Sequence, residues 1–248
     1  MPESDETSPS GQPIHRHAAR QKPFNPAYGD ADKIRQIEAH IEAHLGKPET
    51  VFHEIVSDLV HIDVHFIRAT PKRNFHTLVT TGMSDLPMKV PAGAEERRYA
   101  ELMISLPPQW PIEQEAFKDE RNYWPVRWLK TIARFPHEYD TWIGPGHTIP
   151  TGDPPRPYAA NTRFCCMMVV PSLMSPKAFW KLDLPDRVVN FYALWPIYRE
   201  EMEYKLQHAM TGLLDKLEES PATNPRAVEV VDVDRPNACA KKGWFGRR

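Results

Sequence analysis

Three side chains that could hold a metal ion or pass a proton alternate along one predicted strand. His61, Asp63 and His65 are spaced two residues apart, which places all three on the same face of a strand. Two imidazoles and a carboxylate can bind a divalent metal, so one hypothesis is a metal-dependent hydrolase. A complete site needs a further ligand, and the spacing selects none. The pattern is more typical of the solvated face of an amphipathic strand.

Other catalytic patterns are missing from the sequence. It contains no G-x-S-x-G, no H-E-x-x-H and no C-x-x-C segment. The segment from Gly144 to Ile149 begins like a dinucleotide-binding loop but lacks the third glycine, and Pro145 removes an N–H, so we predict a turn. Cys165 and Cys166 fall in an apolar run, where burial raises the pKa of a thiol. We therefore expect no enzyme, no cofactor and no metal.

Composition excludes several classes of partner. The 248 residues include 31 Lys and Arg against 33 Asp and Glu, which gives a formal net charge of −2. A chain with this net charge is not attracted as a whole to nucleic acid or to an anionic membrane. The longest apolar run, Phe164 to Val170, is far shorter than the roughly 20 residues of a membrane span. The first residues do not resemble a signal peptide. We expect a cytoplasmic protein that binds neither nucleic acid nor membrane.

Hydrophobic periodicity predicts an α+β domain with a mixed, mostly antiparallel sheet packed by helices. The period of 3.6 predicts helices at 30–45, 126–135 and 196–218, and alternating or continuous apolar runs predict strands at 51–56, 61–67, 75–81, 99–106, 164–170 and 188–195. The alternating strands should have one packed and one wetter face. A proline-rich loop is expected between Tyr139 and Asn161.

Specific residues set the expected helix ends. Asp30 can cap the first helix and Gly46 can end it. Pro125 is expected to start the second helix and Pro136 to end it. The third helix should bury one apolar stripe, which consists of Met202, Leu206, Ala209, Leu213 and Leu217.

The two ends of the chain have no hydrophobic period. We expect a disordered N-terminal tail over residues 1–29, one domain over 30–219 and a flexible tail over 220–248. The second tail ends in a basic run that includes Trp244 and Phe245. The sequence assigns no role to that run and sets no oligomeric state.

Four segments, in order, resemble the suppressor of fused domain family. They are Phe75 to Leu86, with its G-M-S-D-L turn, Tyr99 to Leu102, the P-P-Q-W-P segment from Pro107 to Pro111, and the apolar run from Tyr192 to Ile197. The resemblance covers about residues 34–219. It implies a protein-binding role rather than catalysis.

The resemblance also suggests which partner the protein meets. Eukaryotic members sequester zinc-finger transcription factors of the hedgehog pathway and have a second, C-terminal domain, for which residues 220–248 are too few. The chain is therefore similar to single-domain bacterial members, which are associated with immunity or antitoxin roles against a toxin domain. A regulatory binder of another protein is the alternative within the same class.

The resemblance places partner binding by strand addition beside the loop after the middle helix. We expect contacts there from Trp142, Gly146, His147, Thr148, Ile149 and Asp153. Trp142 is an aromatic anchor of the type that dominates interface energetics, and the prolines around it reduce the entropy lost on binding.

Overall fold

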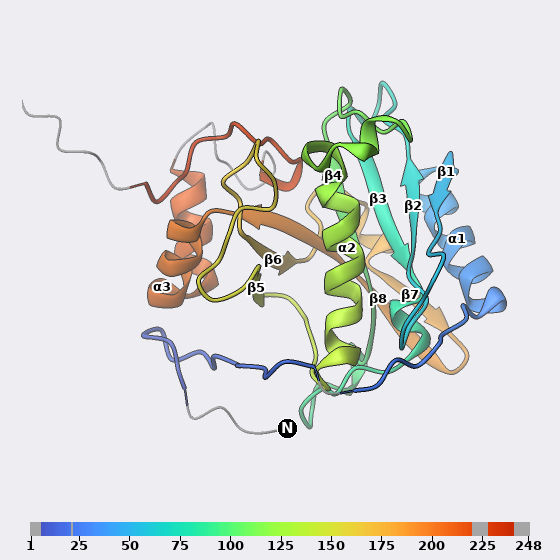
Figure 1. Cartoon of the computed structure of the whole chain (residues 1–248), viewed down its shortest axis with the longest axis horizontal. Helices are drawn as coiled ribbons and strands as arrows, with labels where there is room; N and C mark the ends of the chain where they lie inside the picture. The colour runs from blue at the N-terminus through green and yellow to red at the C-terminus, as the bar shows by residue number, and fades with distance from the viewer. Residues whose placement is uncertain (1–5, 21, 220–227, 241–248) are drawn as a thin grey trace, which may run out of the picture.

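A mixed sheet of eight strands forms the centre of the molecule, behind the long central helix in Figure 1. The computed structural model describes residues 6–20, 22–219 and 228–240. The strands are β1 (Thr50–Phe52), β2 (Asp63–Ile67), β3 (His76–Thr81), β4 (Tyr99–Leu106), β5 (Thr148–Pro150), β6 (Cys166–Val170), β7 (Lys181–Leu184) and β8 (Arg187–Ile197). Their order is β1-β2-β3-β4-β8-β6-β5, and β7 also pairs with β8. Among these strands only β4 and β8 pair in parallel. The expected α+β class and mixed, mostly antiparallel sheet are confirmed.

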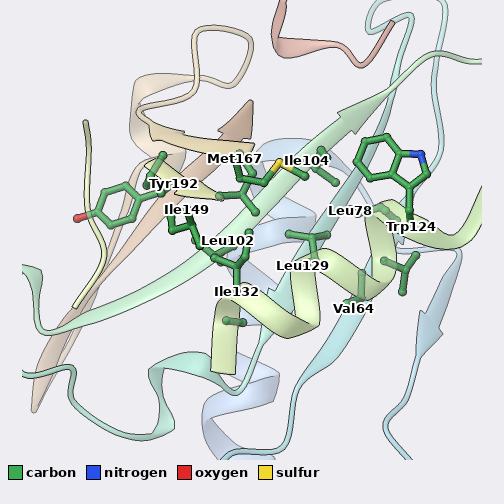
Figure 2. Close-up of a cluster of buried hydrophobic side chains, with 14 of the residues drawn as sticks. Val64, Leu78, Leu102, Ile104, Trp124, Leu129, Ile132, Ile149, Met167 and Tyr192 are labelled. Carbon is green, nitrogen blue, oxygen red and sulfur yellow. The ribbon is translucent and has the colours of Figure 1, made fainter. Parts of the chain in front are cut away.

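Helices cover both faces of the sheet. They are α1 (Ala31–Leu45), α2 (Glu120–Glu138) and α3 (Arg199–Glu218), with short 3-10 turns at Met83–Asp85, Glu95–Arg97, Ala116–Lys118 and Lys177–Phe179. Figure 2 shows Trp124, Leu129 and Ile132 of α2 directed at side chains of β4 on one face. Side chains of α1 and α3 pack with alternate strand residues in a second apolar cluster. The molecule is thus three layers thick, with two cores divided by the sheet.

The prediction that the early strands have one wetter face is wrong. All five residues of β2 are buried, including Asp63 and His65. The reason is α1, which covers this second face and brings Glu38 to 3.5 Å from Nδ1 of His65. Alternation along a strand shows that two faces differ, but it does not show that the more polar face is exposed to water.

The first helix forms as its sequence indicates. The Asp30 side chain accepts hydrogen bonds from the backbone N–H groups of Asp32 and Lys33, and the N–H of Gly46 donates to Glu42. Gly46 has φ of 104°, a conformation that glycine adopts without steric cost. The predicted N-cap and C-cap are both confirmed.

The second helix is longer than predicted, and the expected roles of its prolines are wrong. Asp119 caps α2, so Pro125 and Pro136 both lie inside the helix. Proline at 125 has no N–H to give the carbonyl of Arg121, four residues earlier. The side-chain amide of Asn161 donates to that carbonyl instead, at 3.2 Å. A contact from a distant loop therefore compensates for the proline.

The third helix begins later than predicted and buries a different stripe. Pro196 belongs to β8, and α3 starts at Arg199. The backbone of Ala209 is not helical, with φ of 61°, and this break shifts the helical period. The buried residues are Glu201, Lys205, Leu213 and Leu217, so the first half of the predicted stripe is displaced by one position.

Parts of both expected tails contact the folded domain. Arg16 forms an ion pair with Asp153 at 2.8 Å, and Ser10 donates its N–H to the carbonyl of Leu206. Residues 228–240 run beside the end of β4, where the N–H of Val231 donates to Ser105. The packed region therefore extends beyond the expected limits at 30 and 219. Residues 1–5, 21, 220–227 and 241–248, which include the basic run, lie outside the described part of the chain.

The proline-rich loop and the segment after β6 each contain a strand that the periodicity does not predict. These are β5 and β7, of three and four residues. Neither is long enough to establish a period. No helix in the described ranges is long and apolar enough to cross a membrane.

Candidate protein-binding edge

The short strand β5 ends the sheet on one side. Within the described part of the chain it pairs only with β6, with Thr148 opposite Met168. The carbonyl of His147 accepts from the N–H of Val169 in β6, and the N–H of Thr151 donates to Cys165, the residue before β6. Because main-chain groups alternate in direction along an antiparallel strand, the N–H and C=O of Thr148 point away from β6. Such an outward pair can accept a strand from another chain.

Trp142 and His147 form a ledge that leads into β5. Their ring centroids are 4.3 Å apart, in an edge-on arrangement. Gly144 fits beneath the indole, since a Cβ there would lie 2.8 Å from the Trp142 ring. Gly146 has φ of 91° and donates its N–H to Val169 of β6. The predicted contact residues Trp142, Gly146 and His147 are therefore neighbours.

The other three predicted contact residues have different surroundings. Thr148 is partly exposed on β5, with its hydroxyl near α3. Ile149 points the opposite way, into the core beside Leu102, as Figure 2 shows. Asp153 lies in the loop beyond β5, where Arg16 of the same chain holds it. A role in partner binding stays a prediction for all six, although the Ile149 side chain is buried and its main chain faces β6.

Burial depresses the basicity of the histidine in this ledge. The pKa of His147 is lowered to about 4, mainly by burial and next by the positive charge of Lys205. His147 is therefore neutral at physiological pH. Lys205 itself, on the inner face of α3, also has a lowered pKa because it is buried. The sequence analysis did not predict burial of this lysine, because the predicted apolar stripe excludes position 205.

The three residues of the metal hypothesis do not converge on one point. Asp63 accepts from His53 Nδ1 at 2.8 Å and lies 3.1 Å from Nε2 of His61. His65 instead uses Nε2 to contact the hydroxyl of Thr81 at 3.0 Å. Burial lowers the pKa of His65 to about 4. No group of three or more His, Cys, Asp or Glu in the described ranges is placed to hold a metal ion.

The fold and this edge agree with a known class of protein. The profile of the suppressor of fused protein family matches residues 58–236, which is most of the chain. The chain therefore belongs to the suppressor of fused family, as its sequence motifs indicated. No curated protein matches it.

Solved structures of the same fold include bacterial and animal proteins. A suppressor of fused homologue of Neisseria gonorrhoeae is similar over 86% of this chain and 100% of its own, with a TM-score of 0.59 and 14% identity. The Sufu–Fu complex matches 86% of this chain and 93% of the solved one, with a TM-score of 0.58 and 16% identity. Drosophila suppressor of fused matches 83% of this chain but 50% of its own, with a TM-score of 0.55 and 15% identity.

Proposed function

We propose that this protein is a binding module that takes an extended segment of a partner protein along β5, and that the partner is a toxin domain which it neutralises. The observation that carries the proposal is the outward main chain of Thr148 on an edge strand, beside an aromatic ledge. Family membership supports it, since one similar structure is that of Sufu in complex with Fu.

The opposite edge of the sheet is a poorer acceptor. The carbonyl of Phe52, in the edge strand β1, already accepts a hydrogen bond from Lys130 Nζ at 2.8 Å. Nearby, Glu54 is paired with Arg134 of α2 at 2.5 Å. An edge whose main-chain and charged groups are bonded within the chain offers little to an added strand. This difference favours β5 as the docking edge.

Truncation of Trp142 tests the docking edge once a partner is in hand. If the ledge is a binding hot spot, Trp142→Ala should weaken binding by about 2 kcal/mol or more, which is roughly thirtyfold in affinity. Calorimetry with the partner measures this. Trp128→Ala is a matched control, because that indole is also partly buried but lies on α2. An affinity for the Trp142 variant within twofold, with an unchanged melting temperature, would contradict the assignment.

Growth assays test the neutralising role. If a toxin domain is encoded beside this gene, that domain is expressed in bacterial cells with and without the protein. Rescue of growth by the native chain, together with loss of rescue in Trp142→Ala, is the expected result. Binding without rescue would instead indicate a regulatory binder of another protein. No binding and no rescue would contradict the proposal.

A further inference from the structure

Among the residues that the structure describes, a buried lysine beside β5 has no negatively charged partner. Lys205 of α3 is 8% exposed, and Nζ makes a single hydrogen bond, at 3.4 Å to the hydroxyl of Thr148. No carboxylate of a described residue lies within 4 Å of it, as the ion pairs of the structure show. A buried ammonium is costly unless an opposite charge or several acceptors compensate it. The fold therefore retains a charge that it does not satisfy.

The surroundings of this lysine are neutral or positive. The group that interacts with it on β6 is the Cys166 thiol, whose pKa is raised by burial. On the β5 side, the charges that depress the pKa of His147 are Lys205, His15 and Arg97, all of them basic. No carboxylate is among the main causes of either pKa shift. This corner of the molecule thus favours an incoming negative charge.

Sheet geometry shows where that charge would come from. The Thr148 side chain faces α3, and Ile149 faces the other layer. A strand added to β5 would place one residue directly opposite Thr148, on the same face and with Cβ atoms about 5 Å apart. The side chain of that residue would extend toward Lys205 Nζ.

The main chain of β5 offers few bonds of its own. Thr148 presents an outward N–H and C=O, but the next outward residue, Pro150, has no N–H to donate. Backbone pairing alone is therefore short and carries no sequence information. Discrimination between partners must come from a side chain, and Lys205 is a charged group that contacts Thr148 itself.

We propose that the segment bound at β5 carries an aspartate or glutamate opposite Thr148, and that its carboxylate pairs with Lys205. This inference rests on the proposed function, because it assumes strand addition at β5. It specifies the partner further, as an extended acidic segment rather than any exposed strand. Lys205 then acts as the residue that determines specificity.

Peptide selection provides the test, with the full-length protein as the target. A displayed library of random nine-residue peptides is selected on the native protein and, in parallel, on Lys205→Glu. The native protein should enrich Asp or Glu at one fixed position. The Lys205→Glu variant should enrich Arg or Lys at that same position, since its charge is reversed. Lys216→Met is the matched control, because Lys216 lies on α3 and pairs with Glu219.

Synthetic peptides then separate the inference from the proposed function. Changing the selected acid to its amide should weaken binding to the native protein about thirtyfold or more, and should matter little for Lys205→Met. N-methylation of the peptide at alternate residues tests strand addition without altering the protein. Only methyl groups on the residues that pair with β5 should abolish binding.

Two results would overturn the inference. Peptides that respond to alternate N-methylation but tolerate the amide within twofold would leave strand addition standing and remove the role of Lys205. Peptides that ignore N-methylation, or a library that yields no binder, would reject strand addition at β5 and the inference with it. Melting temperatures of each variant exclude unfolding as the cause.

Discussion

Two consecutive turns of α3 place a charged side chain on the same buried face, and the two differ in their partners. Glu201 is 0% exposed and receives two hydrogen bonds from Arg235, at 2.6 and 2.7 Å. Lys205, one turn later, has one hydrogen bond of 3.4 Å to a neutral hydroxyl. A buried charge is costly without an opposite charge. The charge of Glu201 is compensated by a described residue of the chain, whereas the charge of Lys205 is not.

The complete pair joins the C-terminal segment to the domain. Glu201 also accepts from the N–H groups of Tyr198 and Ala238, each at 3.0 Å, and the Tyr198 hydroxyl donates to the carbonyl of Arg235. The Arg235 guanidinium stacks over Phe164, 4.9 Å from the ring centroid. A satisfied buried charge thus fixes structure. The unsatisfied one at 205 leaves free energy to be gained from a partner.

Breaking the complete pair should have the largest effect on stability. In Arg235→Met the carboxylate of Glu201 stays buried without its cation, so we expect a loss of about 3 to 5 kcal/mol in the free energy of unfolding. Chemical denaturation measures it. Arg163→Met is the matched control, because both Arg163 and Arg235 lie over the Tyr198 ring but Arg163 is exposed. Equal losses in both variants would show that ring stacking, not the buried charge pair, is what matters.

A buried carboxyl without any cation extends the comparison. Glu101 of β4 is 0% exposed and accepts from the hydroxyls of Thr80 and Ser84 and from the N–H of Ser84. Burial raises its pKa from 4.5 to about 7. The folded state therefore favours the protonated form. Its stabilisation is complete below pH 4.5 and is lost as the pH rises to 7.

The pH dependence of stability should show this carboxyl. Between pH 5 and pH 8, the native protein should lose roughly 2 to 3 kcal/mol more unfolding free energy than Glu101→Gln, which cannot ionise. The raised pKa of Glu229 has the same sign but is present in both proteins, so the difference cancels it. Parallel pH profiles of the two proteins would contradict a protonated Glu101 in the folded state.

Removing the incomplete charge should stabilise the protein. Lys205→Met keeps a long, unbranched side chain and removes an ammonium group whose pKa is lowered by burial. We therefore expect a gain of about 1 kcal/mol in the free energy of unfolding. A lowered folded-state pKa means that the native protein becomes more stable as pH rises through that value. The gain from methionine should therefore shrink as the pH approaches 10.5, the value for the unfolded chain. A loss of stability on substitution would show that Lys205 has a structural partner.

The sequence predicted the fold better than it predicted the buried charges. The first helix and β4 could be predicted because periodicity and capping residues act locally. The family could be predicted from short local motifs. The predicted helix start at Pro125 was wrong because the side chain that compensates for this proline, Asn161, is 36 positions away in the chain. The C-terminal segment looked like a tail because its burial depends on Glu201 and on the end of β4, which no local pattern displays.

The candidate edge was predicted in part. The position of the loop and the aromatic type of Trp142 pointed to residues 142–153, and Thr148 lies on an edge strand there. Lys205 was missed because its burial depends on the break at Ala209, which rotates the first half of α3 by one position. A lysine in a helix is normally assigned to the solvent face, so no residue type signalled it.

The smallest effect is expected where a charge pair is exposed. Arg16 and Asp153 are 2.8 Å apart, but their side chains are 62% and 78% exposed. Water and salt screen such a pair, and both side chains lose entropy when they form it. Asp153→Ala, which leaves the other ion pair of Arg16 with Glu6 in place, should therefore leave the unfolding midpoint unchanged within experimental error, at low and at high salt. A clear decrease that disappears at high salt would show that this pair fixes the N-terminal segment to the loop beyond β5. The stability lost on breaking an ion pair would then not depend on how buried the pair is. The difference between Glu201 and Lys205 would need another explanation.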